Sequence, residues 1–120
     1  MRKFVTTSLL FSFALVGALR VSTTGTAARQ DAALIKKGEA VYAAQKCSTC
    51  HAIAGKGLKT NPLDKVGSKL SADDIKQWIT HPVEAAAKAK STKKPPMPAK
   101  YASLPAADLD ALVAYLQSLK

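Results

Sequence analysis

The chain has few aromatic residues, few acidic residues and only two cysteines. No stretch alternates apolar with polar residues in the way that a half-buried β-strand requires, and the β-branched residues are scattered. Alanine and lysine dominate instead, and 48% of the residues are hydrophobic, as in a folded protein. Because 120 residues have room for one domain, we expect a single all-α domain.

A long apolar run is also missing. The longest one, residues 9–19, is shorter than the roughly 18 residues that a membrane span needs. It follows a positively charged start and precedes a group of small residues, which is the order found in secretory signal peptides. We therefore expect residues 1–28 to be a signal peptide cleaved near Ala28, and residues 29–120 to be an exported domain. An uncleaved N-terminal anchor is the alternative.

Acidic residues number 8 against 18 basic ones, and the net charge is +10. Removing residues 1–28 takes away three basic residues and no acidic one, which leaves a net charge of +7. A basic surface attracts nucleic acid, anionic lipid or an acidic protein. Since exported proteins rarely meet nucleic acid, we expect an acidic protein partner.

Apolar residues at spacings of three and four predict helices. The first predicted helix contains Gly38, and a glycine inside a helix usually marks the close approach of another backbone. The last predicted helix has an apolar stripe and is expected to pack against the first helix at Gly38. A third predicted helix begins at Ser71, which is a favourable N-cap. It ends at His81-Pro82, because a residue before proline is disfavoured in the α region. With a short fourth helix, the predicted ranges are 31–47, 71–81, 83–89 and 106–119.

The motif that carries chemistry is C-x-x-C-H, at Cys47, Cys50 and His51. It is a haem-attachment signature. On a helical turn, positions three apart face the same way, so both sulfurs are able to form thioethers to one haem while the adjacent histidine meets the iron. The motif predicts one covalently bound haem c.

The two cysteines have three other interpretations. A disulfide between them closes a very short loop, which adds little stability. A thioredoxin-like pair needs a βαβ setting that the sequence lacks. A zinc site needs four ligands, and only His51 and His81 would supplement the cysteines.

The sixth iron ligand is predicted to be Met97. It is the only methionine after the signal peptide, and it lies in a segment held extended by prolines at 95, 96 and 98. A methionine that merely fills a core usually sits on a periodic helix. His81 is the alternative ligand, although it reads as an exposed residue at a helix end.

These features resemble class I cytochrome c over nearly the whole predicted domain. The features are the C-x-x-C-H string, Gly38 and Tyr42 in the first helix, the Pro-Pro-Met-Pro segment, and Leu112, Tyr115 and Leu116 in the last helix. The resemblance implies a small all-α fold of four to five helices wrapped around one haem, with the first and last helices crossing. It implies His51 and Met97 as axial ligands, as in small bacterial periplasmic members.

The resemblance also implies a role for Pro62, whose carbonyl would accept the Nδ1–H of His51 and orient the ring. Trp78 is expected to pack on the haem edge or to donate its indole N–H to a propionate. The alternative for Trp78 is an ordinary core aromatic.

With both axial positions filled, there is no open iron site for a substrate, so we expect an electron carrier and not an enzyme. A monomer docking acidic redox partners at a lysine-rich haem edge is expected, with no nucleic acid and no stable membrane insertion. The candidate lysines are Lys56, Lys59, Lys88, Lys90, Lys93, Lys94 and Lys100. Alternatives are a haem-bearing subunit of a larger oxidoreductase, a peroxidase that releases Met97, a haem-free metal module, and lysines that are simply solvated.

Overall fold

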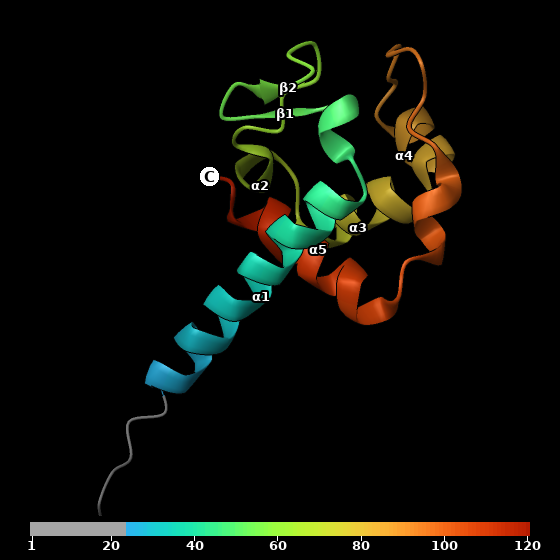
Figure 1. Cartoon of the computed structure of the whole chain (residues 1–120). Coiled ribbons are helices and arrows are strands. Elements are labelled where there is room, and N and C mark those ends of the chain that lie inside the picture. Colours follow the sequence, from blue (N-terminus) through green and yellow to red (C-terminus); the bar gives the residue numbers. More distant parts are fainter. Residues whose placement is uncertain (1–23) are drawn as a thin grey trace, which may run out of the picture.

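Helix α1 (Thr24–Ala44) opens the part of the chain that the computed structural model describes, residues 24–120. Its N-terminal end runs away from the body of the domain, and its C-terminal half crosses α5 (Figure 1). Four more α-helices, two 3-10 turns and one small hairpin make up the rest of this range. They are η1 (Cys47–Thr49), β1 (Ala52–Ile53), β2 (Lys56–Gly57), α2 (Val66–Lys69), α3 (Ala72–Thr80), α4 (Pro82–Lys88), η2 (Ala99–Ser103) and α5 (Ala106–Ser118). The predicted all-α class is confirmed.

The crossing of α1 and α5 depends on Gly38. A Cβ atom at this position would lie 2.0 Å from the carbonyl oxygen of Ala111 and 2.6 Å from Cβ of Tyr115. Only glycine lets the two helix backbones come this close. One turn further along α1, the ring of Tyr42 packs edge-on against Tyr115, with centroids 5.9 Å apart. The predicted contact between the first and last helices is confirmed.

The core lies between α1, α3 and α5. Its buried members are Val41, Tyr42, Ile75, Ile79, Leu109, Leu112, Val113 and Leu116. Leu34, further towards the start of α1, is 37% exposed and is not part of this core. Burying apolar side chains is the main source of stability in such a domain. Around this core lies a second set of apolar side chains that are only half-buried, and this set includes Cys47 and Met97.

Helix α3 begins as predicted at Ser71. The Ser71 hydroxyl accepts from the Asp74 backbone N–H at 3.1 Å, and the Asp74 carboxylate accepts from the Ser71 backbone N–H at 3.4 Å, which completes a capping box. The Ser71 hydroxyl also donates to the Asp74 carboxylate at 2.7 Å. This hydrogen bond first, and then the one from the Ser71 backbone N–H, hold the pKa of Asp74 below its usual value. The helix ends at His81, and Pro82 starts α4, where its missing N–H costs nothing.

Three short elements were not predicted. The β1–β2 hairpin pairs Ala52 with Gly57 and Ile53 with Lys56, and its turn has left-handed backbone at Ala54 and Gly55. Helix α2 and the turn η2 are the other two. All three are six residues long or fewer, so they are too short to show a hydrophobic periodicity.

Residues 1–23 of the predicted signal peptide lie outside the described residues, whereas the expected cleavage point at Ala28 falls within α1. Among the helices that are described, none is both long and apolar enough to cross a membrane.

Candidate functional site

The two cysteines and the histidine follow directly on the end of α1. Lys46 adopts a left-handed backbone with φ of 55°, which ends α1 and starts the turn η1. The backbone N–H groups of Cys50 and His51 both donate to the Cys47 carbonyl, at 3.1 and 3.0 Å. Residues three apart eclipse each other in a 3-10 turn, so the Cys47 and Cys50 side chains leave the backbone on the same side. This is the alignment that the motif predicts.

Both cysteines are free in the structure. Cys47 is half-buried against the core, and Cys50 is exposed. Burial raises the pKa of the Cys47 thiol. A backbone hydrogen bond and the Lys100 ammonium lower this pKa, but by less. The Cys47 thiol is therefore neutral at pH 7, since its ordinary pKa already lies above that value.

The half-buried His51 ring is held by a backbone carbonyl. Its Nδ1 atom lies 3.2 Å from the carbonyl oxygen of Asn61. A carbonyl oxygen only accepts, so the ring proton must be on Nδ1 and Nε2 keeps its lone pair. Burial lowers the pKa of His51, with the Asn61 hydrogen bond opposing it. The result is a neutral imidazole with a free Nε2, which is the form that binds a metal.

The acceptor is Asn61 and not Pro62, so the role expected of Pro62 is corrected. A parallel bridge pairs Ala52 with Pro62, and through it Ala52 N–H donates to the Asn61 oxygen at 3.3 Å while Leu63 N–H donates to the Ala52 oxygen at 2.8 Å. Successive carbonyls of an extended chain point to opposite sides. Since the Asn61 carbonyl faces His51 and Ala52, the Pro62 carbonyl faces away from them.

Residues 57–61 form a loop that braces the motif from outside. Leu58 N–H donates to the Ser48 carbonyl at 3.1 Å. Gly57 has φ of +105°, and a Cβ there would lie 2.1 Å from the His51 carbonyl oxygen and 2.8 Å from that of Ser48. Gly57 is thus required both by its backbone conformation and by its closeness to the motif. Sequence reasoning missed it, although glycine so soon after the motif was the available signal.

Met97 packs against the same core cluster as Cys47, and like Cys47 it is half-buried. Before Met97 in the chain, the Lys93 ammonium donates to the Thr60 carbonyl at 3.4 Å. After Met97 in the chain, Tyr101 lies near both cysteines. Burial raises the pKa of Tyr101 most, and the nearby Cys47 and Cys50 raise it further. The methionine segment therefore approaches the bracing loop before Met97 and the motif after it.

His81 lies in a different setting from Met97. Its side chain is exposed at the junction of α3 and α4, and its Nδ1 lies 2.8 Å from the Thr80 hydroxyl. Within residues 24–120, no group of three or more His, Cys, Asp or Glu side chains gathers as a metal site would require. The four ligands that a zinc site would need are therefore not brought together among these residues.

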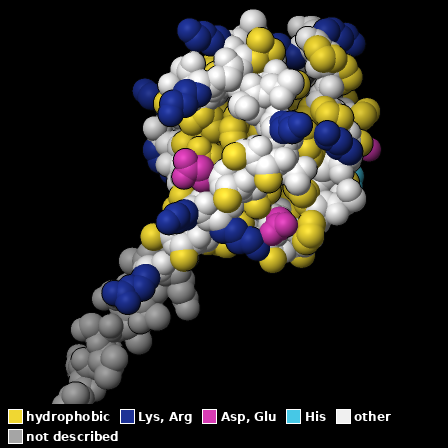
Figure 2. Space-filling model, viewed as in Figure 1, with side chains coloured by type: hydrophobic (Ala, Val, Ile, Leu, Met, Phe, Trp, Pro, Cys, Tyr) yellow, Lys and Arg dark blue, Asp and Glu magenta, His cyan; other side chains and the backbone are white. Residues whose placement is uncertain are grey.

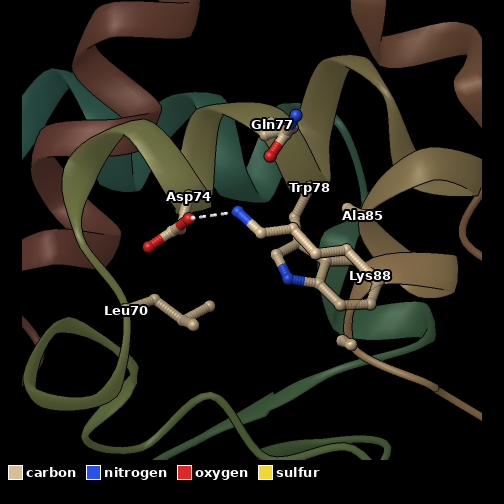
Figure 3. A pocket seen from close by; sticks show the side chains of 7 residues that line it. Leu70, Asp74, Gln77, Trp78, Ala85 and Lys88 are labelled. Atoms are coloured by element: carbon tan, nitrogen blue, oxygen red, sulfur yellow. Dashed lines mark ion pairs between the residues drawn. The ribbon is translucent and has the colours of Figure 1, made fainter.

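Trp78 lines a separate pocket of about 280 Å³ between α3 and α4 (Figure 3). Apolar walls come from Leu70 and Ala85, and an ion pair between Lys88 and Asp74 at 3.7 Å lies beside the indole. Neither cysteine, nor His51, nor Met97 lines this pocket. The structure thus places Trp78 outside the buried core, while its predicted contact with haem stays a prediction.

A family comparison agrees with this geometry. The family model for cytochrome c matches residues 35–120, which is most of the chain. The chain belongs to the cytochrome c family. A comparison with curated proteins and one with solved structures gave no match. The matched range includes the motif, the bracing loop and Met97, so this cytochrome c domain is one for haem-based electron transfer.

Proposed function

We propose that this cytochrome c is a single-electron carrier with one haem c, attached by thioethers to Cys47 and Cys50 and ligated by His51 and Met97. One observation carries the proposal. The contact between His51 Nδ1 and the Asn61 carbonyl fixes the His51 tautomer that leaves Nε2 free. His51 directly follows Cys50, the second of two free thiols that leave the turn on the same side. We further propose that the protein is exported to the bacterial periplasm.

The residues fit a haem. Two thiols on one side of a turn match two thioether bonds, and His51 supplies a neutral nitrogen. Met97 supplies a thioether, and like Cys47 it packs on the core cluster. An apolar lining for a large flat ring would be drawn from the half-buried side chains that pack on the core. They are Cys47, Ile53, Leu63, Val66, Leu70, Met97, Tyr101, Leu104, Tyr115 and Leu119.

This donor set favours electron transfer over catalysis. When bound, the haem supplies an iron centre that accepts and releases one electron. His51 and Met97 would both hold the iron, so the chain would leave no ligand position for a substrate. Histidine and methionine together also raise the reduction potential, which suits a carrier.

The expected partners are acidic redox proteins, and the charge distribution supports this. Lys and Arg side chains outnumber Asp and Glu on the face shown in Figure 2, where they lie among apolar atoms. Lys93 joins the methionine segment to the loop after the motif, and Lys100 lies over the Tyr101 ring at 5.1 Å. A basic rim of this kind steers an acidic partner at long range. The rate of electron transfer should then fall as salt is added.

A second function, that of a haem-bearing subunit in a larger complex, is favoured by two exposed apolar side chains. Val83 is 69% exposed and Leu58 is 47% exposed. Leu58 lies in the loop that braces the motif. Size-exclusion chromatography of the native protein separates the two functions, because a monomer supports the carrier and a stable complex with other proteins supports the subunit.

The ligand assignment is tested by replacing Met97 with alanine and recording the near-infrared absorption band of sulfur-to-iron ligation in the oxidised protein. We expect the band to disappear and carbon monoxide to bind rapidly to the reduced variant. His81→Ala is the matched control and should keep the band, because His81 is exposed and hydrogen-bonded to the Thr80 hydroxyl. A Met97→Ala spectrum equal to that of the wild type, together with a changed His81→Ala spectrum, would reverse the assignment.

A further inference from the structure

Asn61 contacts the haem motif through both its side chain and its backbone. Its side-chain amide nitrogen donates to the Cys50 carbonyl oxygen at 3.3 Å. Its own carbonyl oxygen lies 3.2 Å from His51 Nδ1 and accepts from the Ala52 N–H at 3.3 Å. Its backbone N–H donates to the Leu58 carbonyl at 3.3 Å, which closes the bracing loop. One residue thus contacts three successive residues of the motif and its continuation.

The two contacts depend on each other. The position of the Asn61 carbonyl relative to the His51 ring is set by how far residue 61 lies from the motif. The amide contact to Cys50 is the side-chain restraint on that separation, since the other ties of the loop to Ser48 and Ala52 are made by backbone alone. Without the amide, only the backbone hydrogen bonds hold the loop, so residue 61 has more freedom to move outward, and a hydrogen bond weakens steeply as its length grows.

The orientation of this carbonyl has a chemical consequence. A histidine that donates its second ring N–H to a carbonyl is held in one tautomer and one rotation, and it becomes a more basic ligand. A more basic ligand favours the oxidised, more positive iron. Loss of the contact therefore makes the reduction potential more positive.

We propose that Asn61 is a positioning residue for the His51 ligand: its side-chain amide anchors the loop to Cys50 and so keeps its carbonyl against His51 Nδ1. The inference rests on the proposed function, because only an iron-bound histidine converts this contact into a potential. It adds a residue that neither the motif nor the predicted role of Pro62 includes.

The test uses the haem-bearing protein and two variants. Asn61→Ala removes the amide, and Asn61→Asp keeps its size but puts an acceptor-only carboxylate in its place. Thr60→Ala is the matched control, because it changes the neighbouring side chain of the same loop and leaves the Thr60 carbonyl that Lys93 contacts. The readouts are the solvent-exchange rate of the His51 Nδ1 proton by NMR and the reduction potential.

We expect the Nδ1 proton to exchange about fivefold faster in both Asn61 variants, the factor that corresponds to the net contribution of one hydrogen bond. The potential of Asn61→Ala should become more positive, while Thr60→Ala matches the wild type in both readouts. Asn61→Asp is judged on exchange alone, because its charge shifts the potential by itself.

A merely structural role gives a different result. In that case the Asn61 variants unfold at lower temperature, but their Nδ1 exchange rates equal that of Thr60→Ala, and the potential of Asn61→Ala equals that of Thr60→Ala. The inference is then wrong while the proposed function stands. A wild-type chain without covalent haem overturns the proposed function first and the inference with it.

Discussion

Replacing Gly38 with alanine probes the helix crossing on which the core is built. The new Cβ would lie 2.0 Å from the Ala111 carbonyl oxygen, whereas ordinary contact begins at 3.4 Å. The helices must then separate by about 1 Å, since both near atoms of Ala111 belong to backbone that has no other rotamer to adopt.

Two terms of opposite sign decide the outcome. Overpacking costs about 1–3 kcal/mol, and separation also weakens the edge-on pair of Tyr42 and Tyr115, which is worth about 0.5–1.5 kcal/mol. Alanine in place of glycine gains about 1 kcal/mol of helix propensity. The expected net loss in the free energy of unfolding is about 1–3 kcal/mol, measured by denaturant titration of the haem-bearing protein.

The exposed position Ala40 in the same helix supplies the control. Ala40→Gly should cost about 1 kcal/mol through propensity alone, because the Ala40 side chain is exposed. If Gly38→Ala stabilises the protein by a similar amount, propensity governs Gly38 and the reasoning from the close crossing is refuted.

Three further predictions follow from local geometry. Gly57→Ala should lower the fraction of chains that carry haem, read as the ratio of haem to protein absorbance, because its Cβ would lie 2.1 Å from the His51 carbonyl; an unchanged ratio would show that the loop yields freely. Ser71→Ala should lower the free energy of unfolding by about 1 kcal/mol through loss of the cap, and equal stability in urea would contradict this. Burial, with smaller effects of neighbouring groups, raises the pKa of Tyr42 from 10.0 to about 12, so its contribution to stability is fully present below pH 10 and is lost as pH rises towards 12. Tyr42→Phe should therefore lose less stability between pH 9 and about 12 than the wild type does, and parallel curves would show that Tyr42 titrates normally.

Local signals in the sequence predicted most of the architecture. Gly38 marked the crossing, Ser71 marked a helix start, and the His81-Pro82 pair marked a boundary, because each acts through its own backbone or nearest neighbours. The 3-10 turn likewise keeps Cys47 and Cys50 in the relation that their spacing predicts.

What sequence reasoning missed depends on contacts between distant segments. The choice between Asn61 and Pro62 is a shift of one residue in an extended chain, and it is decided by the bridge to Ala52. The hairpin is too short for any periodicity, and a left-handed alanine at residue 54 has no sequence signal. The approach of the Met97 segment to the motif depends on packing against the core.

The central claim, that haem is covalently attached at Cys47 and Cys50, is tested by acid denaturation followed by extraction with organic solvent. The chain is produced in a host that attaches haem to exported proteins, next to a variant with both cysteines replaced by alanine. Thioether-bound haem stays with the denatured chain, so the account predicts that the wild-type chain keeps its haem absorbance and that the variant loses it. Complete loss of haem absorbance from the denatured wild-type chain would contradict the account.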